Sequence, residues 1–329
     1  MRSEATPAID IGSRDGSPQA AARTARWAER NGFDGLQVAE TQHDPLIACT
    51  VAGQATERIR LATSITVAFA RSPMTVAMTA NDVQLATGGR FALGLGSQVQ
   101  AHIEKRFSMP WSAPAPRMRE FIAAVRAIWE SWRTGDRLNV RGEHYRHTLM
   151  TPFFSPGPNP HGSPDIWLAG VGPAMTRLAG EAADGFIAHA FTTREYLAEV
   201  SLPALAEGRT RGERTSTDVI LSPFVVTGSD EAARAEQERA VRQQIAFYGS
   251  TPAYRAVLEL HGWGDAADRL HAASRRGEWT EMAGIIDDDM MDAFATFAEP
   301  GSLRETLSAR FDGIATRICA TIPVPDDAE

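Results

Sequence analysis

The stretch Pro164-Asp-Ile-Trp-Leu-Ala-Gly-Val-Gly-Pro-Ala-Met-Thr-Arg-Leu-Ala-Gly-Glu-Ala-Ala-Asp-Gly-Phe-Ile-Ala-His-Ala190 has the pattern of a strand, a glycine loop, a helix and a second strand. The apolar run 166–169 lacks a helical period, which predicts a strand covered on both faces. Two glycines and Pro173 favour a sharp turn into a helix. In a parallel sheet this turn presents free backbone N–H groups that can bind a phosphate. The alternative is that the glycines serve only the geometry of the turn.

The same alternation of short apolar runs and helical segments extends over most of the chain. We expect strands at 8–12, 36–39, 59–67, 90–95, 166–169, 186–190, 219–227 and 314–320. About eight strands separated by helices favour an α/β fold of the TIM (β/α)8 barrel type, with a doubly wound open sheet as the competing architecture. In a barrel the functional site lies on the loops that follow the strands.

Three connections from a helix to a strand contain an Asp-Gly pair, at 33–35, 183–185 and 311–313. A connection of this kind needs a residue that tolerates positive φ just after the helix. We therefore expect the glycines to supply that conformation.

Two segments interrupt the alternation within what we expect to be a single domain, 1–329. An insertion at about 98–164 contains the helical spacing of Phe121, Val125, Ile128 and Trp132, and ends in a stretch with five prolines. A helical excursion at about 250–298 shows helical pieces and no clear strand.

Composition limits the classes of partner. The formal net charge is −8 and no block of Lys or Arg exceeds two residues, which argues against a nucleic-acid or anionic-membrane surface. Cys49 and Cys319 lie far apart without CxxC spacing, which is typical of buried thiols in a reducing cytoplasm. No signal peptide or run of 18 apolar residues is present, so we expect a soluble cytoplasmic protein.

Few residues on the loops after the predicted strands can carry chemistry by themselves. The candidates are Glu40, Gln42, His43, residues 63–70, Ser97, Gln98, His102, residues 170–173, His189 and Thr192. They include no pair of nearby carboxylates, HExxH motif, Cys/His cluster or G-x-S-x-G elbow, so we expect no metal site and no hydrolase. What remains suits an organic cofactor that supplies the chemistry. His43 beside Asp44 is alternatively a local capping residue, and His189 alternatively a core histidine.

Several segments resemble the luciferase-like monooxygenase superfamily, and most closely its coenzyme F420-dependent oxidoreductases. They are 61–74, 88–97, 170–173 and 182–185, so the resemblance extends in order over nearly the whole chain. It implies a TIM barrel with an insertion after the fourth strand. It also implies a flavin or deazaflavin lying across the strand ends.

The resemblance further implies roles for individual residues. The loop at 170–173 would hold the cofactor phosphate, a cis peptide bond between Ser64 and Ile65 would lie behind the ring, and His43 would be catalytic. The implied cofactor-binding set is Ser64, Ile65, Thr66, Ser97, Gly170, Val171, Gly172, Pro173 and His189.

Two positions depart from the pattern of the family. Ile47 stands where some relatives have Trp, and Gln98-Val99 where some have Glu. The general acid of the sugar-phosphate-oxidising members is therefore missing, which argues against that substrate class.

We expect an F420-dependent oxidoreductase that transfers a hydride between the deazaflavin and a small organic substrate, with His43 handling the proton. The first alternative is an FMN-dependent monooxygenase that uses O2 and reduced flavin from a partner reductase. The second is a barrel that binds the cofactor without turnover. Family members commonly form homodimers or larger assemblies, and we expect the same here.

Overall fold

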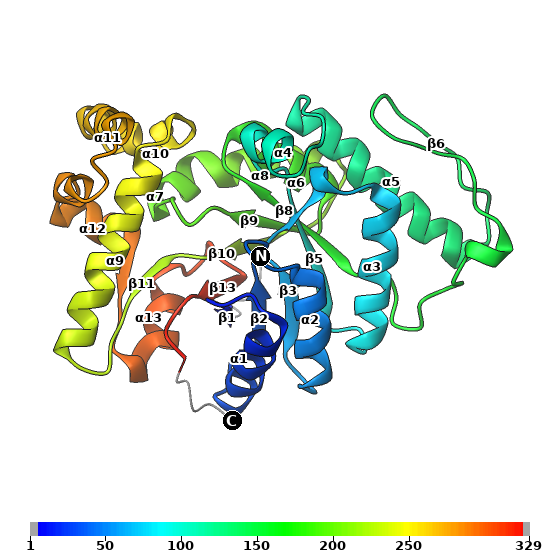
Figure 1. Cartoon of the computed structure of the whole chain (residues 1–329), viewed down its shortest axis with the longest axis horizontal. Helices are drawn as coiled ribbons and strands as arrows, with labels where there is room; N and C mark the ends of the chain where they lie inside the picture. Colours follow the sequence, from blue (N-terminus) through cyan, green and yellow to red (C-terminus); the bar gives the residue numbers. More distant parts are fainter. Residues whose placement is uncertain (1–5, 325–329) are drawn as a thin grey trace.

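The computed structural model describes residues 6–324 (Figure 1). Its centre is a barrel of eight parallel strands: β1 (Ala8–Gly12), β2 (Gly35–Val38), β3 (Arg60–Thr63), β5 (Phe91–Gly96), β8 (Asp165–Gly170), β9 (Gly185–Ala188), β10 (Asp218–Leu221) and β13 (Arg317–Ala320). Neighbours pair in the order β3-β2-β1-β13-β10-β9-β8-β5, and pairing of β3 with β5 closes the ring. The predicted barrel is confirmed, and the open sheet is wrong.

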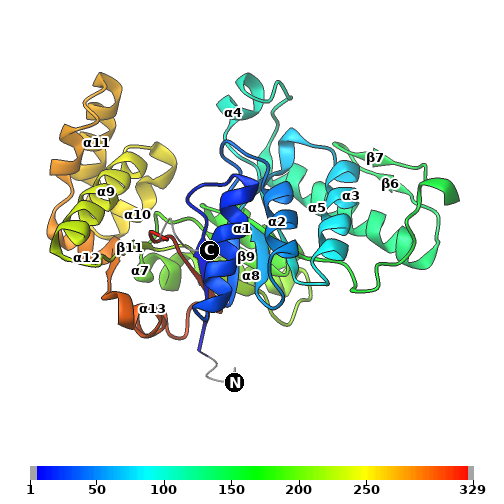
Figure 2. The ribbon, with the colours of Figure 1, turned by 60° about the horizontal axis from the view of Figure 1, so that its bottom comes forward.

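Helices surround the barrel (Figures 1 and 2). They are α1 (Pro18–Arg30), α2 (Pro45–Gln54), α3 (Pro73–Ala86), α5 (Pro114–Thr134), α6 (Pro173–Ala182), α8 (Leu202–Arg211) and α13 (Leu303–Arg310). Short helical pieces are η1 (Ala68–Ala70), α4 (Gln100–Lys105), η2 (Pro152–Phe154), α7 (Arg194–Tyr196), the π-helix η3 (Leu197–Ser201) and η6 (Pro300–Ser302). Ser17 and Ser72 cap α1 and α3, each followed by proline, as Ser-Pro pairs favour.

The strand predicted at 59–67 is interrupted. β3 ends at Thr63, a cis peptide bond joins Ser64 to Ile65, and the short β4 (Thr66–Val67) then pairs with β5. The strand predicted at 219–227 is likewise divided into β10 and β11 (Phe224–Val226), with Ser222-Pro223 between them. Pro223 has no backbone N–H to donate, so the ladder cannot continue through it.

The expectation for the Asp-Gly pairs is correct only in part, because Gly313 has positive φ (69°) whereas Gly35 and Gly185 do not. At these two positions the barrel interior has no room for a side chain. A Cβ at Gly35 would lie 2.5 Å from Asp10 Oδ1, and one at Gly185 would lie 2.5 Å from Trp167 Cδ1. Trp167, 2% exposed, fills the interior together with Ala62, Ala92, Ile187 and Ile220.

In two of the Asp-Gly pairs, the aspartate makes two hydrogen bonds to the backbone of the preceding barrel strand. Asp34 N–H donates to Ile9 O (2.8 Å) and its carboxylate accepts from Ile9 N–H (2.7 Å). Asp184 makes the same two bonds to Ile166, at 2.7 and 2.8 Å. Each pair therefore joins successive parallel strands at their amino ends.

The insertion between β5 and β8 contributes α5 to the ring of helices and carries a small hairpin of β6 (Val140–Arg141) and β7 (Arg146–His147). Gly135 ends α5 with φ 79°, where the sequence predicts the stop.

A helical cap stands beside the barrel at residues 224–297 (Figure 2). After β11 it comprises α9 (Glu231–Gly249), η4 (Pro252–Tyr254), α10 (Arg255–Leu260), α11 (Gly264–Arg276), η5 (Glu281–Ile285), α12 (Asp288–Phe294) and β12 (Ala295–Phe297). Its core, which includes Ile245, Leu270 and Phe294, is distinct from that between the barrel and its helices. β12 pairs in parallel with β11, so the expectation of no strand in this region is wrong; three residues are too few to show alternation.

No helix among residues 6–324 is long and apolar enough to cross a membrane.

Candidate active site

A cavity of about 450 Å³ opens at the carboxyl ends of the barrel strands. This is within the size range of small-molecule and cofactor sites. The barrel contributes Gly12, Ser13, Arg14, Gln37, Ala39, Ser64, Ala190, Ser222, Pro223, Cys319 and Thr321, and the cap adds Phe224, Val225, Gln237, Ala240, Val241, Gln244 and Tyr248. Most polar groups in this lining are neutral. Arg14 is the cation, and no Asp, Glu or His occurs among these described residues.

The predicted cis peptide bond between Ser64 and Ile65 is present, just after the carboxyl end of β3. Ser64 N–H donates to Val38 O (2.8 Å) and Ile65 O accepts from Glu40 N–H (3.2 Å), so the bulge is bonded to the end of β2. A Cβ at Gly96 would lie 2.8 Å from the Ile65 side chain, so the glycine lets Ile65 pack closely. Ser64 lines the cavity, and Ile65 lies behind it against the core.

An ionic network fastens the loop after β2 to the start of α3. The Glu40 carboxylate accepts from Val67 N–H (2.7 Å) and from Arg71 Nη1 (2.8 Å). Arg71 Nη2 donates to Asp44 Oδ2 (2.8 Å), and Asp44 Oδ1 caps α2 by accepting from Leu46 N–H (2.9 Å). This network holds the loop that carries His43.

His43 itself is exposed and is not among the residues that line the cavity. The predicted catalytic histidine therefore lies on a loop that follows β2, as expected, but outside the cavity lining.

The glycine loop at 170–173 ends β8 and begins α6, as the sequence predicts. Gly172 is the N-cap residue and offers no side-chain hydrogen bond, so backbone N–H groups in the first turn lack a side-chain cap. A Cβ at Gly172 would meet no atom within 4 Å, which shows open space beside the helix start. These features suit a phosphate, although the loop does not line the 450 Å³ cavity.

His189 lies at the end of β9 between the barrel and the cap. Its Nδ1 accepts from Phe191 N–H (3.0 Å), so Nε2 carries the proton in the neutral ring and donates to Tyr254 Oη (3.1 Å). Burial lowers the pKa of His189 to about 4 and raises the pKa of Tyr254 to about 12. The imidazole is thus neutral near pH 7, and Tyr254 keeps its own proton for donation. His189 adjoins the cavity through Ala190.

The two remaining predicted residues also lie at strand ends. Thr66 is fully buried and its Oγ1 has no hydrogen-bond partner within residues 6–324. Ser97 is half-buried, and its Oγ donates to Gln98 O (3.2 Å). Neither residue lines the cavity.

Sequence reasoning missed a buried polar group in the barrel interior. Gln37 Nε2 donates to Asp10 Oδ2 (2.8 Å), and Arg317 Nη1 donates to Asp10 Oδ1. Burial raises the pKa of Asp10 and Arg317 opposes this rise. The signal was available, since Asp10 and Gln37 are each polar residues in the middle of an apolar strand, which places them on the inner face of a barrel. The cap residues Gln237, Gln244 and Tyr248 gave no such signal, because a long helix with a polar face is usually solvated.

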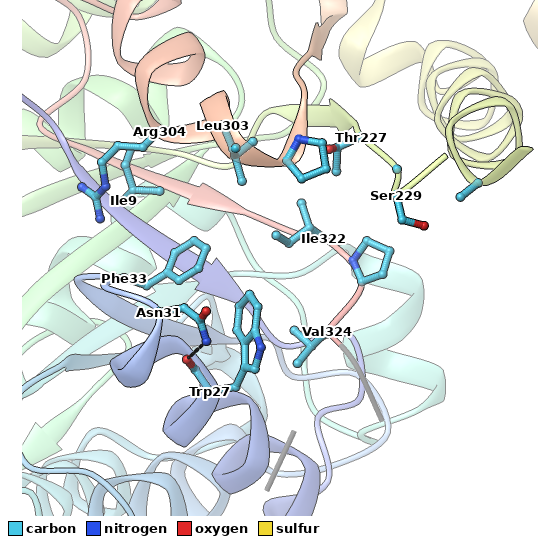
Figure 3. Close-up of a pocket in the computed structure, with 15 residues that line it drawn as sticks. Ile9, Trp27, Asn31, Phe33, Thr227, Ser229, Leu303, Arg304, Ile322 and Val324 are labelled. Carbon is cyan, nitrogen blue, oxygen red and sulfur yellow. Dashed lines mark hydrogen bonds between the residues drawn. The ribbon is translucent and has the colours of Figure 1, made fainter. Parts of the chain in front are cut away.

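A larger cavity, about 640 Å³, lies outside the barrel between α1 and α13 (Figure 3). Its walls are mainly apolar and include Trp27, Phe33, Leu303 and Ile322. Arg304 at its margin is paired with Asp34 Oδ2 (2.9 Å). This cavity does not include the residues predicted for the site, so its size alone does not identify it as the reactive site.

Glu120, Glu143 and His144 form the group of potential metal ligands found among residues 6–324. The Glu120 carboxylate already accepts from the N–H groups of Glu143, His144 and Tyr145 at 2.8 to 3.3 Å. The group is therefore explained as a clamp on the tip of the β6–β7 hairpin.

The sequence model of the luciferase-like monooxygenase family matches residues 4–317. An uncharacterised protein of Mycobacterium tuberculosis is 49% identical over 310 residues, which cover 92% of this chain and 91% of the relative. The 5,10-methylenetetrahydromethanopterin reductase of Methanolobus tindarius is 27% identical over 313 residues, 94% of this chain and 91% of the enzyme.

Solved structures share the fold. The coenzyme F420-dependent tetrahydromethanopterin reductase of Methanopyrus kandleri superposes with a TM-score of 0.78 at 20% identity, covering 99% of this chain and 95% of that one. The oxygenating constituent of 3,6-diketocamphane monooxygenase from Pseudomonas putida, in complex with FMN, gives 0.67 at 14% identity, covering 99% and 94%.

Proposed function

Because the chain belongs to the luciferase-like monooxygenase family, we propose that this oxidoreductase depends on coenzyme F420 and transfers a hydride between the deazaflavin and a small organic substrate. The coenzyme F420-dependent structural neighbour supports this choice of cofactor. The substrate class of that enzyme is not carried over.

The observation that supports this function best is the chemistry of the cavity lining. The lining beside the Ser64–Ile65 bulge offers hydroxyl and amide groups, but no Asp, Glu or His among its described residues. Cys319 is 3% exposed, and burial raises the pKa of its thiol, so it is no nucleophile at neutral pH. Such a site can bind and orient an organic cofactor, which supplies the redox chemistry.

The residues fit the proposed cofactor in two ways. Backbone N–H groups of the loop at 170–172 and of the first turn of α6 would hold a phosphate, and Ser64 would contact the rest of the molecule from the cavity wall. Ile65, Thr66, Ser97 and His189 would support that wall from behind or beside it. When bound, the deazaflavin would donate or accept the hydride. His189 would be an uncharged neighbour of the cofactor at neutral pH, since burial lowers its pKa to about 4.

We assign proton transfer to His43. The loop that carries it begins at Ala39, which lines the cavity, and the Glu40–Arg71–Asp44 network restrains that loop. A barrel that only binds the cofactor needs no proton donor or acceptor at this position, whereas hydride transfer to or from a substrate does.

The second candidate is an FMN-dependent monooxygenase that receives reduced flavin from a partner reductase and uses O2. Its support is the FMN-containing structural neighbour, because the same fold there accommodates a flavin. In both candidates we propose a cytoplasmic homodimer or larger assembly, and the two buried free cysteines suit a reducing compartment.

A ligand panel tests the choice of cofactor. Thermal melts and absorbance titrations are run with F420, FMN, FAD and NADPH. We expect F420 alone to raise the melting temperature and to change its spectrum on binding. Binding of FMN with no effect of F420 would select the monooxygenase, and protection by neither would refute both.

A histidine variant tests turnover. His43→Ala should keep cofactor affinity and lose roughly 100-fold in the rate of deazaflavin reduction or oxidation once a substrate is found. His161→Ala, another exposed histidine, is the matched control and should behave as wild type. Unchanged turnover of His43→Ala would remove this residue from the mechanism.

A further inference from the structure

Gln37 occupies the inner face of β2 and lines the cavity, although its side chain is only 2% exposed. Its Oε1 is buried and has no hydrogen-bond partner within residues 6–324. Leaving a buried acceptor unpaired is costly, and native proteins rarely do so without a functional reason. An orphan acceptor at a ligand cavity indicates that the ligand supplies the missing donor.

Two charged residues fix which atom of the amide is the orphan. The Asp10 carboxylate, 1% exposed, accepts from Gln37 Nε2 at 2.8 Å and from Arg317 Nη1. An ionised carboxylate accepts only, so the amide nitrogen must face Asp10 and the oxygen must be the atom left over. The absence of a side chain at Gly35 makes room for Asp10, since a Cβ there would lie 2.5 Å from Asp10 Oδ1.

We propose that Gln37 is a positioning residue for the cofactor ring, whose imide N–H donates a hydrogen bond to Gln37 Oε1. This inference rests on the proposed function. Flavins and deazaflavins share a pyrimidinedione edge in which one N–H lies between two carbonyl groups. Gln37 complements the N–H, because its Nε2 already donates to Asp10 and the atom left without a partner is the acceptor Oε1. Ser64, which belongs to the bulge proposed to lie behind the ring, lines the same cavity from the neighbouring strand.

The test removes the donor from the ligand and the acceptor from the protein in turn. The ligand is F420 or FMN, whichever wild-type protein binds, and its derivative methylated on the imide nitrogen. Wild type should bind the methylated ring roughly 5- to 100-fold more weakly. Gln37→Met, of similar length without polar atoms, should bind both rings with nearly equal affinity. The matched control Gln54→Met, on α2 away from the cavity, should discriminate as wild type does.

A direct measurement covers the case in which Gln37→Met fails to fold. In a crystal structure of the wild-type complex, the imide nitrogen should lie within about 3.2 Å of Gln37 Oε1. A longer separation overturns the inference. So does equal binding of the two rings by wild type, or full discrimination by Gln37→Met, and in these cases the proposed function survives. If wild type binds neither F420 nor FMN, the proposed function fails, and this inference fails with it.

Discussion

Gly94 of β5 lies where the backbone of β3 approaches most closely. The Thr63 side chain both accepts from Gly94 N–H (2.9 Å) and donates to Gly94 O (2.8 Å), so the two strands are held together at this point. A Cβ on Gly94 would overlap the Thr63 carbonyl oxygen. Because backbone and not a flexible side chain stands in the way, no small rearrangement can relieve the overlap.

We expect Gly94→Ala to destabilise the protein by about 3 kcal/mol or more, measured by denaturant unfolding. Gly284→Ala is the matched control, since a Cβ there would meet nothing within 4 Å and its φ is not positive. It should be within about 0.5 kcal/mol of wild type. Equal stability of the two variants would show that β3 and β5 are not packed as described.

Asp184 predicts a pH dependence. Burial alone would raise the pKa of this carboxyl, but Arg126, Ile166 N–H and Arg214 together outweigh burial and lower it. A lowered folded-state pKa means that the stabilisation is complete above the unfolded value, near pH 4, and is lost as pH falls through the folded value. Asp184→Asn should cost about 2 kcal/mol at pH 7.

The same variant should show a shallower fall in stability than wild type below about pH 4. Denaturant midpoints of both proteins between pH 7 and the acid limit give the comparison. If stability falls equally with pH in the two proteins, the pKa of Asp184 does not differ between the folded and unfolded states.

At the scale of elements, α6 offers a substitution with opposite effects on stability and ligand binding. Gly172→Asp places a good N-cap residue at the helix start, in open space, and should stabilise the protein by a few tenths of a kcal/mol. The added carboxylate would repel a phosphate there, so binding of F420 or FMN should weaken roughly tenfold. The counterpart without the phosphate (riboflavin for FMN, the deazariboflavin for F420) should bind unchanged.

Gly172→Ala controls for the loss of glycine, since its Cβ also points into open space. Isothermal titration of all three proteins with the cofactor that wild type binds, and with its counterpart that lacks the phosphate, makes the measurement. Equal weakening for both ligands in Gly172→Asp would remove the phosphate from this loop.

Elements with local signals could be predicted from the sequence. Ser17-Pro18 and Ser72-Pro73 marked helix starts, and Gly135 marked a helix end, because caps depend on a few neighbouring residues. The reason for Gly35 and Gly185 could not be predicted, since Asp10 and Trp167 reach them only after the barrel closes. β12 was missed because its partner β11 is about seventy residues away in the chain.

At the scale of the whole molecule, both cysteines are buried in different parts of the barrel, Cys49 on α2 and Cys319 on β13. Burial raises the pKa of both thiols. We expect neither to react with an aromatic disulfide reagent in the native protein, and both to react on unfolding. A rapidly modified thiol in the native state would contradict the burial, and Cys49→Ala would identify which one it is.

The candidate site was predictable in outline and not in detail. Parallel strands bring their carboxyl ends to one rim, so the loop at 170–173 could be placed there from the strand order. The Ser64–Ile65 cis bond was expected only from the resemblance to the family. The wall formed by Tyr248 and its neighbours on α9 depends on how the cap folds back over the barrel. No local pattern encodes that contact. His43 remains a prediction, because it is not among the residues that line the cavity.

The pairing of β11 with β12 means that the cap leaves and rejoins the barrel at adjacent points. Strands paired in this way lie about 4.8 Å apart. The segment between β11 and β12 could therefore be replaced by one of another length, because its two ends would still lie side by side. Tyr248, Gln237 and Gln244 of α9 belong to that exchangeable part, whereas Gln37, Ser64 and the loop at 170–173 belong to the barrel. A different cap could therefore be joined to this barrel, which would change the cap residues that face the cavity and leave the barrel residues as they are.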